Sequence, residues 1–135
     1  MNRTKPTGER DEPSDDMLSL GKGWIELQRR HFAGESTESV FWAYSAMDEL
    51  CDRNPKQCFQ QILTILDIDS SELILGTLAA GPLEDLLSRH GVDVVDQIET
   101  ESRRNPKLKV LLTGVWRNVI DEDVWNRIQA LANSA

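Results

Sequence analysis

The chain has 135 residues, of which 39% are hydrophobic and 28% charged, and its formal net charge is −8. This length and composition fit one globular domain with its own core, and four Trp residues argue against a wholly disordered chain. The sequence contains neither an apolar signal-peptide segment nor a stretch approaching the roughly 20 apolar residues of a membrane span. Two cysteines, Cys51 and Cys58, are too few for a disulfide framework. We therefore expect a cytoplasmic protein with reduced thiols and no membrane partner.

Negative charge is concentrated in one part of the sequence. Residues 67–101 hold nine Asp or Glu against one Arg, a balance of −8, whereas residues 102–120 hold five Lys or Arg and no acid, a balance of +5. Concentrated negative charge repels nucleic acid and attracts basic partners, so nucleic-acid binding is not favoured. The alternatives are an ordinary solvated acidic surface and neutralisation by the basic segment within the fold.

The N-terminal part of the chain predicts a tail followed by a helix. Residues 1–16 carry eight charged residues and no apolar residue after Met1, so we expect a disordered tail before a single all-α domain, 17–135. Apolar residues at three- and four-residue spacing indicate a helix over about 14–32, which Gly34 ends.

Two further helices are predicted next. The hydroxyls of Ser36 and Thr37 can cap a helix that reaches about Arg53. The inward stripe of that helix is Val40, Phe41, Tyr44, Met47 and Cys51. Asn54 and Pro55 then mark a new helix start, because Asn is a good cap and Pro fits the first helical position.

The stretch LAAGPLEDLLSRHG, residues 78–91, predicts that one helix ends and another begins. Ser70 is expected to cap a short helix over about 71–80. Gly81 should stop that helix, because it can leave helical geometry, and Pro82 should start the next one.

The helix that starts at Pro82 is expected to end at His90, with Gly91 as a left-handed terminating residue. Helical spacing separates its two faces. The inward face is Leu83, Leu86, Leu87 and His90, and the outward residues are Glu84 and Asp85.

Three more helices complete the predicted domain. One covers about 93–104, with its acids outward and Glu99 placed for an i,i+4 pair with Arg103. Asn105 and the following Pro open another, whose inner face is Leu108, Leu111, Leu112, Val115, Trp116 and Val119. The last predicted helix covers about 122–132, with Asp121 as its cap.

A short motif supports a repeated helical arrangement. RNPK occurs at 53–56 and again at 104–107, and each copy joins one predicted helix to the next. No segment shows the period-two alternation of a strand. We therefore expect an all-α fold of about seven to eight short helices, packed as helical hairpins in an α-solenoid-like array or an irregular bundle.

The residues suggest no catalytic or metal-binding constellation. His90 invites an acid–base role with Glu84 and Asp85, but helical geometry turns these carboxylates away from it, so a core or capping role is expected. The two Cys and two His residues lack the spacing of a zinc site, and phosphate-cradling glycine patterns are absent. We predict no metal and no cofactor, and a binding protein rather than an enzyme.

The sequence resembles a family of small bacterial proteins that carry a domain of unknown function. The resemblance covers roughly residues 42–125 and rests on two elements, AAGPLEDLL followed by HG, and LLxGVW. Between them the family shows an Ile-Glu helix and an Arg-x-Pro start, which correspond here to Ile98, Glu99, Arg104 and Pro106. The resemblance implies an all-α cytoplasmic bacterial protein and assigns no catalytic residue.

The leading functional hypothesis is a small protein-binding module, of an immunity or inhibitor-like kind, that presents an acidic surface to a basic protein partner. Trp42 is added because it is offset from the apolar face of its helix, and exposed Trp is a frequent interface anchor. The candidate residues are Glu84, Asp85, Asp93, Asp96, Glu99 and Trp42. Two alternatives are a small enzyme or ligand-binding protein with a cleft around residues 81–90, and a homo-oligomeric structural protein.

Overall fold

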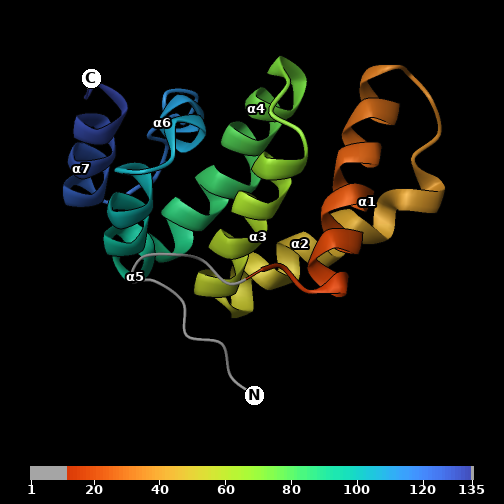
Figure 1. Ribbon diagram of the computed structural model, residues 1–135, viewed down its shortest axis with the longest axis horizontal. Helices are drawn as coiled ribbons and strands as arrows, with labels where there is room; N and C mark the ends of the chain where they lie inside the picture. The colour runs from red at the N-terminus through yellow and green to blue at the C-terminus, as the bar shows by residue number, and fades with distance from the viewer. Residues whose placement is uncertain (1–11, 135) are drawn as a thin grey trace.

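A computed structural model describes residues 12–134, and this part of the chain is helical without strands. The helices are α1 Asp15–Phe32, α2 Phe41–Arg53, α3 Pro55–Ile68, α4 Glu72–Leu78, α5 Glu84–Ser102, α6 Pro106–Leu112 and α7 Glu122–Ala132 (Figure 1). A short 3₁₀ turn, Glu38–Val40, precedes α2, and a π-helical turn, Ala79–Leu83, joins α4 to α5. Because that turn makes one continuous rod, the described part has six separate helices. The all-α prediction is confirmed, with slightly fewer helices than expected.

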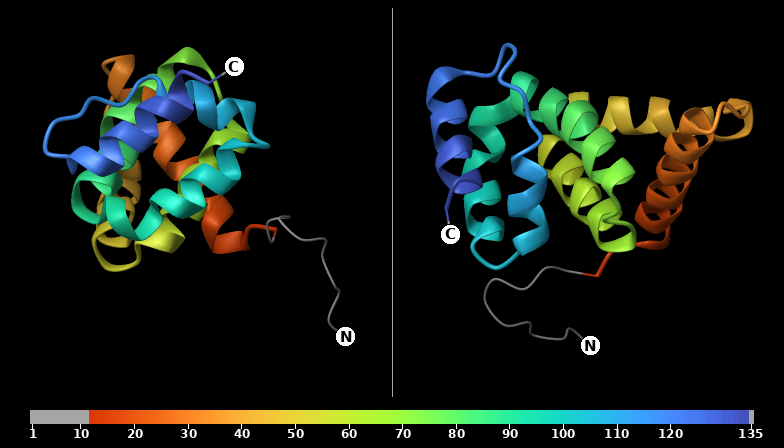
Figure 2. Two further views of the ribbon diagram at one scale, coloured as in Figure 1. Left: turned by 90° about the vertical axis from the view of Figure 1, so that its left-hand side faces the viewer. Right: turned by 90° about the horizontal axis from the view of Figure 1, so that it is seen from above.

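The helices follow one another along the long axis of the molecule. α1 packs against α2 and α3, α3 packs against α5, and α5 and α6 pack against α7. Figures 1 and 2 show α1 at one end of the array and α7 at the other. Most contacts therefore join helices that are close in chain order, as in an array of helical hairpins. None of the helices in residues 12–134 has the length and apolar character needed to cross a membrane.

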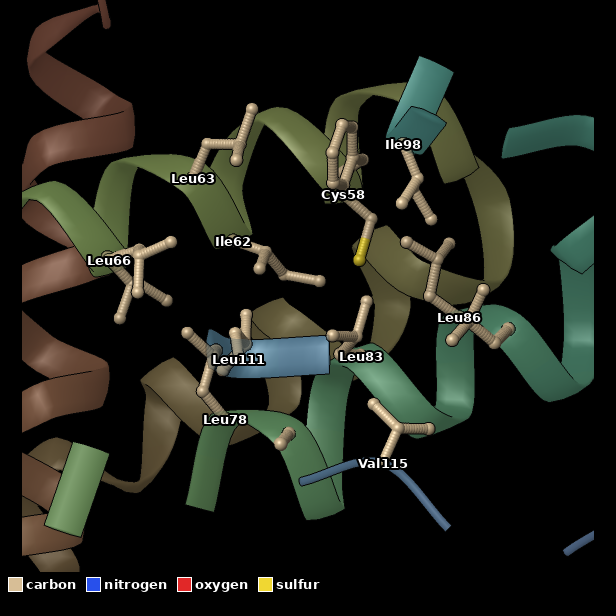
Figure 3. Close-up of a cluster of buried hydrophobic side chains, with 14 of the residues drawn as sticks. Cys58, Ile62, Leu63, Leu66, Leu78, Leu83, Leu86, Ile98, Leu111 and Val115 are labelled. Carbon is tan, nitrogen blue, oxygen red and sulfur yellow. The ribbon is translucent and has the colours of Figure 1, made fainter. Parts of the chain in front are cut away.

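The core is built around α3 and the rod formed by α4, the π turn and α5. Every side chain from Gln61 to Leu66 is buried, because helices cover α3 on several sides. Figure 3 shows α3 side chains facing the rod and α6. The labelled members of this cluster are Cys58, Ile62, Leu63, Leu66, Leu78, Leu83, Leu86, Ile98, Leu111 and Val115.

The two RNPK motifs start helices in the same way. The Asn54 side-chain oxygen accepts a hydrogen bond from the Gln57 N–H at 3.2 Å, and the Asn105 oxygen accepts one from the Leu108 N–H at 3.2 Å. Proline occupies the first helical turn in both. The predicted starts of α3 and α6 are thus confirmed, and side-chain caps also begin α1 and α7, at Ser14 and Asp121.

Two other predicted caps are wrong. Thr37 makes no side-chain cap bond, because the chain enters α2 through the 3₁₀ turn, and the Ser36 hydroxyl accepts only from the Glu38 N–H at 3.4 Å. α4 begins after Ser71 rather than Ser70. The predicted end of α1 is confirmed, since Gly34 has a left-handed φ of +73°. The predicted tail falls on residues 1–11, outside the described part, and on 12–16, where Asp15 already opens α1.

The predicted helix break at Gly81 and Pro82 is also wrong. α4 passes through the π turn, Ala79–Leu83, directly into α5. Pro82 has no N–H to donate, and a π turn, whose hydrogen bonds span one residue more than α-helical ones, accommodates that loss within the rod. Gly81 has no left-handed φ.

The rod bends at His90, where the helix was predicted to end. His90 has φ −139° and ψ 26°, outside helical geometry, whereas Gly91 continues the helix without a left-handed φ. A Cβ added to Gly91 would lie 2.9 Å from Cγ1 of Val124, so glycine is required here because α7 approaches α5 closely. Gly114 has a similar role, since its Cβ would lie 3.0 Å from Cβ of Ala79.

The predicted helix through Val119 ends at Leu112. Gly114 disfavours a helix, and the Thr113 hydroxyl donates to the Val110 carbonyl at 2.6 Å, which satisfies one of the last free carbonyls. Residues 113–121 form an irregular connection that leads to α7 (Figure 2). Trp116 and Val119, predicted to be buried, are therefore exposed.

α2 buries a different set of residues from the predicted one. Phe41 and Tyr44 are about half exposed and stack on each other, with ring centroids 5.4 Å apart. The buried residues of α2 are Ala43, Met47 and Cys51. The reason is that α2 lies at the end of the array, where neighbouring helices cover only one side of it.

Candidate functional site

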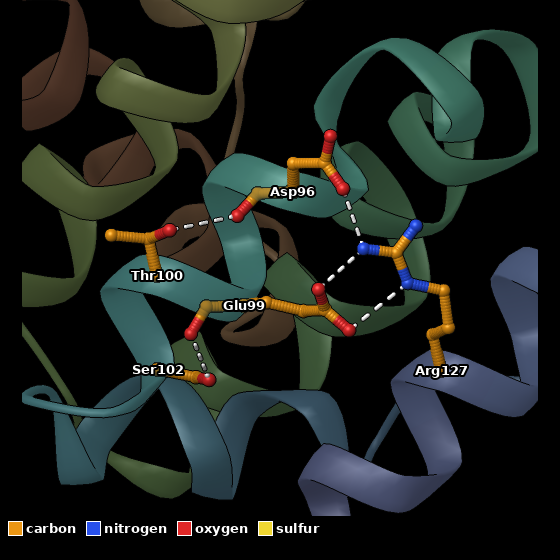
Figure 4. A network of polar contacts seen from close by, with 5 residues as sticks. All are labelled: Asp96, Glu99, Thr100, Ser102 and Arg127. Carbon is orange, nitrogen blue, oxygen red and sulfur yellow. Dashed lines mark hydrogen bonds and ion pairs between the residues drawn. The ribbon is translucent and has the colours of Figure 1, made fainter.

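Two of the six candidate residues form an ion-pair network with α7. Arg127 donates from Nε to Glu99 at 3.0 Å and from Nη2 to Asp96 at 2.5 Å, with a further bond from Nη2 to Glu99 (Figure 4). The hydrogen bonds from Arg127 to Glu99 lower the pKa of Glu99 below its usual value. Glu99 is thus bonded to Arg127 rather than to the predicted Arg103. Part of the acidic charge is thus neutralised within the fold, by Arg127 of α7 and, from the basic segment 102–120, by Arg104, which pairs with Glu101 at 2.8 Å.

Glu84 and Asp93 lie on α5 beside the 113–121 connection. The Asn118 side-chain amide donates to Glu84 at 3.4 Å, and Asn118 itself has a left-handed φ of 46°. Asp93 is largely exposed, with one carboxylate oxygen 3.9 Å from Nδ1 of His90. These two carboxylates therefore remain at the surface, next to the segment that carries Trp116.

His90 was predicted to face the core with the leucines, but it lies at the bend of the rod. Its side chain is 25% exposed, and Nε2 donates to the main-chain carbonyl of Asp52 at 3.0 Å, which ties α5 to the end of α2. Because Nε2 carries the proton of this bond, Nδ1 is the ring nitrogen left to accept one, and it lies 3.9 Å from a carboxylate oxygen of Asp93. Among the described residues no group of three His, Cys, Asp or Glu side chains could hold a metal ion.

A recess of about 300 Å³ lies at the bend, between α5 and the connection to α7. Its walls include Val92 and Asp93 from α5 and Val119 and Asp121 from the connection. Val92 and Val119 are 72% and 73% exposed, and Trp116, three residues before Val119, is 76% exposed. We define the Trp116 face as the recess residues Val92, Asp93, Val119 and Asp121 together with Trp116 of the connection and Glu84, which is hydrogen-bonded to the connection through Asn118.

The other two candidate residues lie elsewhere. Trp42 is 48% exposed on α2, and its ring packs over α1, because a Cβ on Gly23 would come within 2.7 Å of it. Asp85 lines a separate pocket between α1, α2 and the π turn. The six candidates are thus distributed over several places, and only Glu84 and Asp93 lie on the Trp116 face.

Sequence reasoning missed Trp116, because helical spacing assigned it to an inner face. The signal that could have revealed its exposure is Gly114, a poor helix former that follows directly on LLT. If the helix ends at Gly114, helical spacing no longer places Trp116 and Val119 on its inner face.

A family model described as "Family of unknown function (DUF6869)" matches residues 31–135, so the chain belongs to this family. The matched range includes both sequence elements on which the resemblance rests. No curated protein and no solved structure matches the chain.

Proposed function

We propose that this member of a family of unknown function is a protein-binding module, and that the Trp116 face binds a basic segment of another protein. The observation that carries the proposal is the exposure of Trp116 and of Val119, three residues later in the same connection, together with that of Val92, which lines the same recess as Val119. Contiguous exposed apolar patches mark interaction sites, and Trp is enriched among the residues that dominate binding energy.

The charge around the apolar residues indicates the kind of partner. The acids of the Trp116 face are Glu84, Asp93 and Asp121, and the bases near it are Arg89, which lines the recess, and Arg117 of the connection. Arg89 is paired with Asp48 at 3.3 Å, and the Arg117 guanidinium donates to the Ile120 carbonyl at 3.4 Å. The surplus of negative charge favours a partner that brings Lys or Arg around an apolar side chain.

The proposed surface is smaller than the acidic region indicated by the sequence. Asp96 and Glu99 hold Arg127, so their charge already has a cation. An immunity or inhibitor-like role agrees with a compact acidic surface of this type. Two buried free cysteines support a reducing compartment such as the bacterial cytoplasm.

A homo-oligomer built on the same face is disfavoured by electrostatics. A two-fold interface would bring the face against its own copy, so Asp93 and Asp121 would meet the same acids of the second chain. Like charges brought together in an interface oppose association. A partner with complementary charge avoids that cost.

The test uses a fluorescently labelled lysine-rich peptide with one central Phe, and the same peptide with Glu in place of every Lys. Fluorescence anisotropy should show binding of the lysine peptide alone, weakening as salt is added. Trp116→Ala should weaken binding by about ten-fold, the equivalent of about 1.4 kcal/mol.

Trp42→Ala is the matched control, because it removes the same kind of exposed side chain at the other end of the array. It should leave peptide affinity unchanged. Equal binding of both peptides, or no effect of Trp116→Ala, would refute the proposal. Concentration-dependent self-association in light scattering that Trp116→Ala abolishes would replace it with the homo-oligomer alternative.

A further inference from the structure

A second cavity lies between α1, α2 and the π turn, at the end of the array opposite α7. Its volume is about 430 Å³, within the range of small-molecule sites. Residues of α1 and α2 form two of its walls, with the rod on the third side. The buried side chains of Trp24, Met47 and Cys51 are among the lining residues and give the cavity an apolar, polarisable surface.

The same cavity is lined by polar groups of mostly one sign. Asp48 and Asp85 contribute carboxylates, and Tyr44 and His31 contribute exposed aromatic rings. Arg89 pairs with Asp48 at 3.3 Å but is not itself part of the lining. Within residues 12–134 Asp85 forms no ion pair closer than 4.0 Å, so its carboxylate is available in the cavity as an acceptor for a positive ligand.

The surroundings of Asp85 disfavour a negative charge there. Burial raises the pKa of Asp85, Arg89 acts against this rise, and the carboxylates of Asp48 and Glu84 add to it. A ligand cation beside Asp85 would offset both the desolvation and the repulsion. Perturbed carboxyl groups in a cleft are characteristic of functional sites.

The π turn shapes the third wall. Ala80, Gly81 and Pro82 lie on the cavity side of the rod, and a Cβ added to Gly81 would meet no atom within 4 Å. π turns are rare and occur frequently at functional sites. The turn that sequence reasoning took for a helix break is thus part of a cavity wall.

We propose that this cavity binds a small organic cation, with its ammonium group at Asp85 and its apolar or aromatic body against Trp24 and Met47. The aromatic rings favour the same class of ligand, because the faces of Trp and Tyr attract cations. An anion of equal size would face the carboxylates of Asp48 and Asp85 instead. The inference is independent of the protein-binding proposal, since it uses none of the Trp116 face.

Isothermal titration calorimetry with three matched probes tests the proposal. The probes are 2-phenylethylamine, its neutral counterpart 2-phenylethanol and the anion 3-phenylpropionate. The amine should bind about ten times more tightly than the alcohol, because it alone brings a positive charge to Asp85. The anion should bind most weakly of the three.

Two substitutions locate the binding. Asp85→Asn keeps the shape of the side chain and removes its charge, so it should reduce amine affinity about ten-fold and leave alcohol affinity unchanged. Asp93→Asn is the matched control, an exposed aspartate on the same helix that does not line the cavity, and should have no effect. Trp116→Ala should also leave amine affinity unchanged.

The proposal is overturned if the amine binds no better than the alcohol, or if none of the probes binds at millimolar concentration. Amine binding that Asp85→Asn does not weaken would equally overturn it. Quenching of Trp fluorescence by the amine that is lost in Trp24→Phe provides a second measurement of the location. A failure of peptide binding at the Trp116 face would not affect these results.

Discussion

Gly91→Ala tests why glycine is needed at the bend of the rod. The sequence suggested a left-handed helix end, whereas the structure shows a helical glycine against which Val124 of α7 packs. An added Cβ would lie 2.9 Å from Cγ1 and 3.3 Å from Cγ2 of Val124. Because Val is stiff at χ1 and this one is buried, α7 has to move to accommodate the new methyl group.

The magnitude follows from two opposing effects. Replacing Gly by Ala inside a helix stabilises by about 1 kcal/mol. Overpacking a close contact costs about 1–3 kcal/mol, and a contact below 3.0 Å belongs in the upper part of that range. We expect Gly91→Ala to destabilise the protein by about 1–2 kcal/mol.

A double-mutant cycle with Val124→Ala isolates the contact. Val124→Ala alone removes two buried methyl groups and should cost about 2 kcal/mol. In the double variant the clash is gone, so the total loss should be about 2 kcal/mol smaller than the sum of the single losses. Urea denaturation measures all four proteins. Additive losses would refute the close-approach explanation, because a left-handed glycine would be needed whichever residue occupies position 124.

Three further predictions concern helix caps, an ion pair and a thiol. Asn54→Ala and Asn105→Ala should each lower the free energy of unfolding by about 1 kcal/mol in urea, and an unchanged midpoint would contradict the capping role. Arg127→Ala should destabilise the protein at neutral pH, because Arg127 lowers the pKa of Glu99 in the folded state. The stability that this ion pair contributes is complete above the pKa of Glu99 in the unfolded chain, and it is lost as the pH falls through the lower pKa of the folded protein. In acid titrations of stability the difference from the unsubstituted protein should therefore shrink as the pH falls below the usual pKa range of a glutamate, and a difference independent of pH would contradict this. Cys51 lines the cavity, and a hydrogen bond from the Cys58 thiol lowers its pKa. Cys51 should therefore react with iodoacetamide before Cys58, as measured by peptide mass spectrometry, and the reverse order would contradict this.

Helix starts were predictable from the sequence because they depend on a few adjacent residues. Asn54 and Asn105 each supply a cap oxygen three residues before the N–H that they accept from, so the chemistry of the motif alone fixes the geometry. Apolar spacing likewise located the buried Leu108, Leu111 and Leu112 of α6, since one face of a regular helix must meet the core.

The candidate sites were much less predictable. Periodic spacing placed Trp116 inside, although its helix ends before reaching it. The sequence suggested a cleft around residues 81–90 only as an alternative, and it did not indicate that α1 and α2 form two walls of the cavity found there. The acidic residues do form a cluster in the sequence, but Asp96 and Glu99 pair with Arg127 of α7, about thirty residues later in the chain. Such pairings depend on how helices dock, which no local pattern encodes.

The sequence by itself thus determined the all-α class and the starts of α1, α3, α6 and α7, because these rest on capping hydrogen bonds and helical periodicity over a few residues. Its motifs also identified the family. Only the tertiary structure decided the course of the chain at Gly81 and Gly91. Both glycines look like helix ends in isolation, but one lies in a continuous π turn and the other beneath Val124. Their role depends on contacts with α7 and on the continuity of the rod, and these exist only once distant segments have packed together.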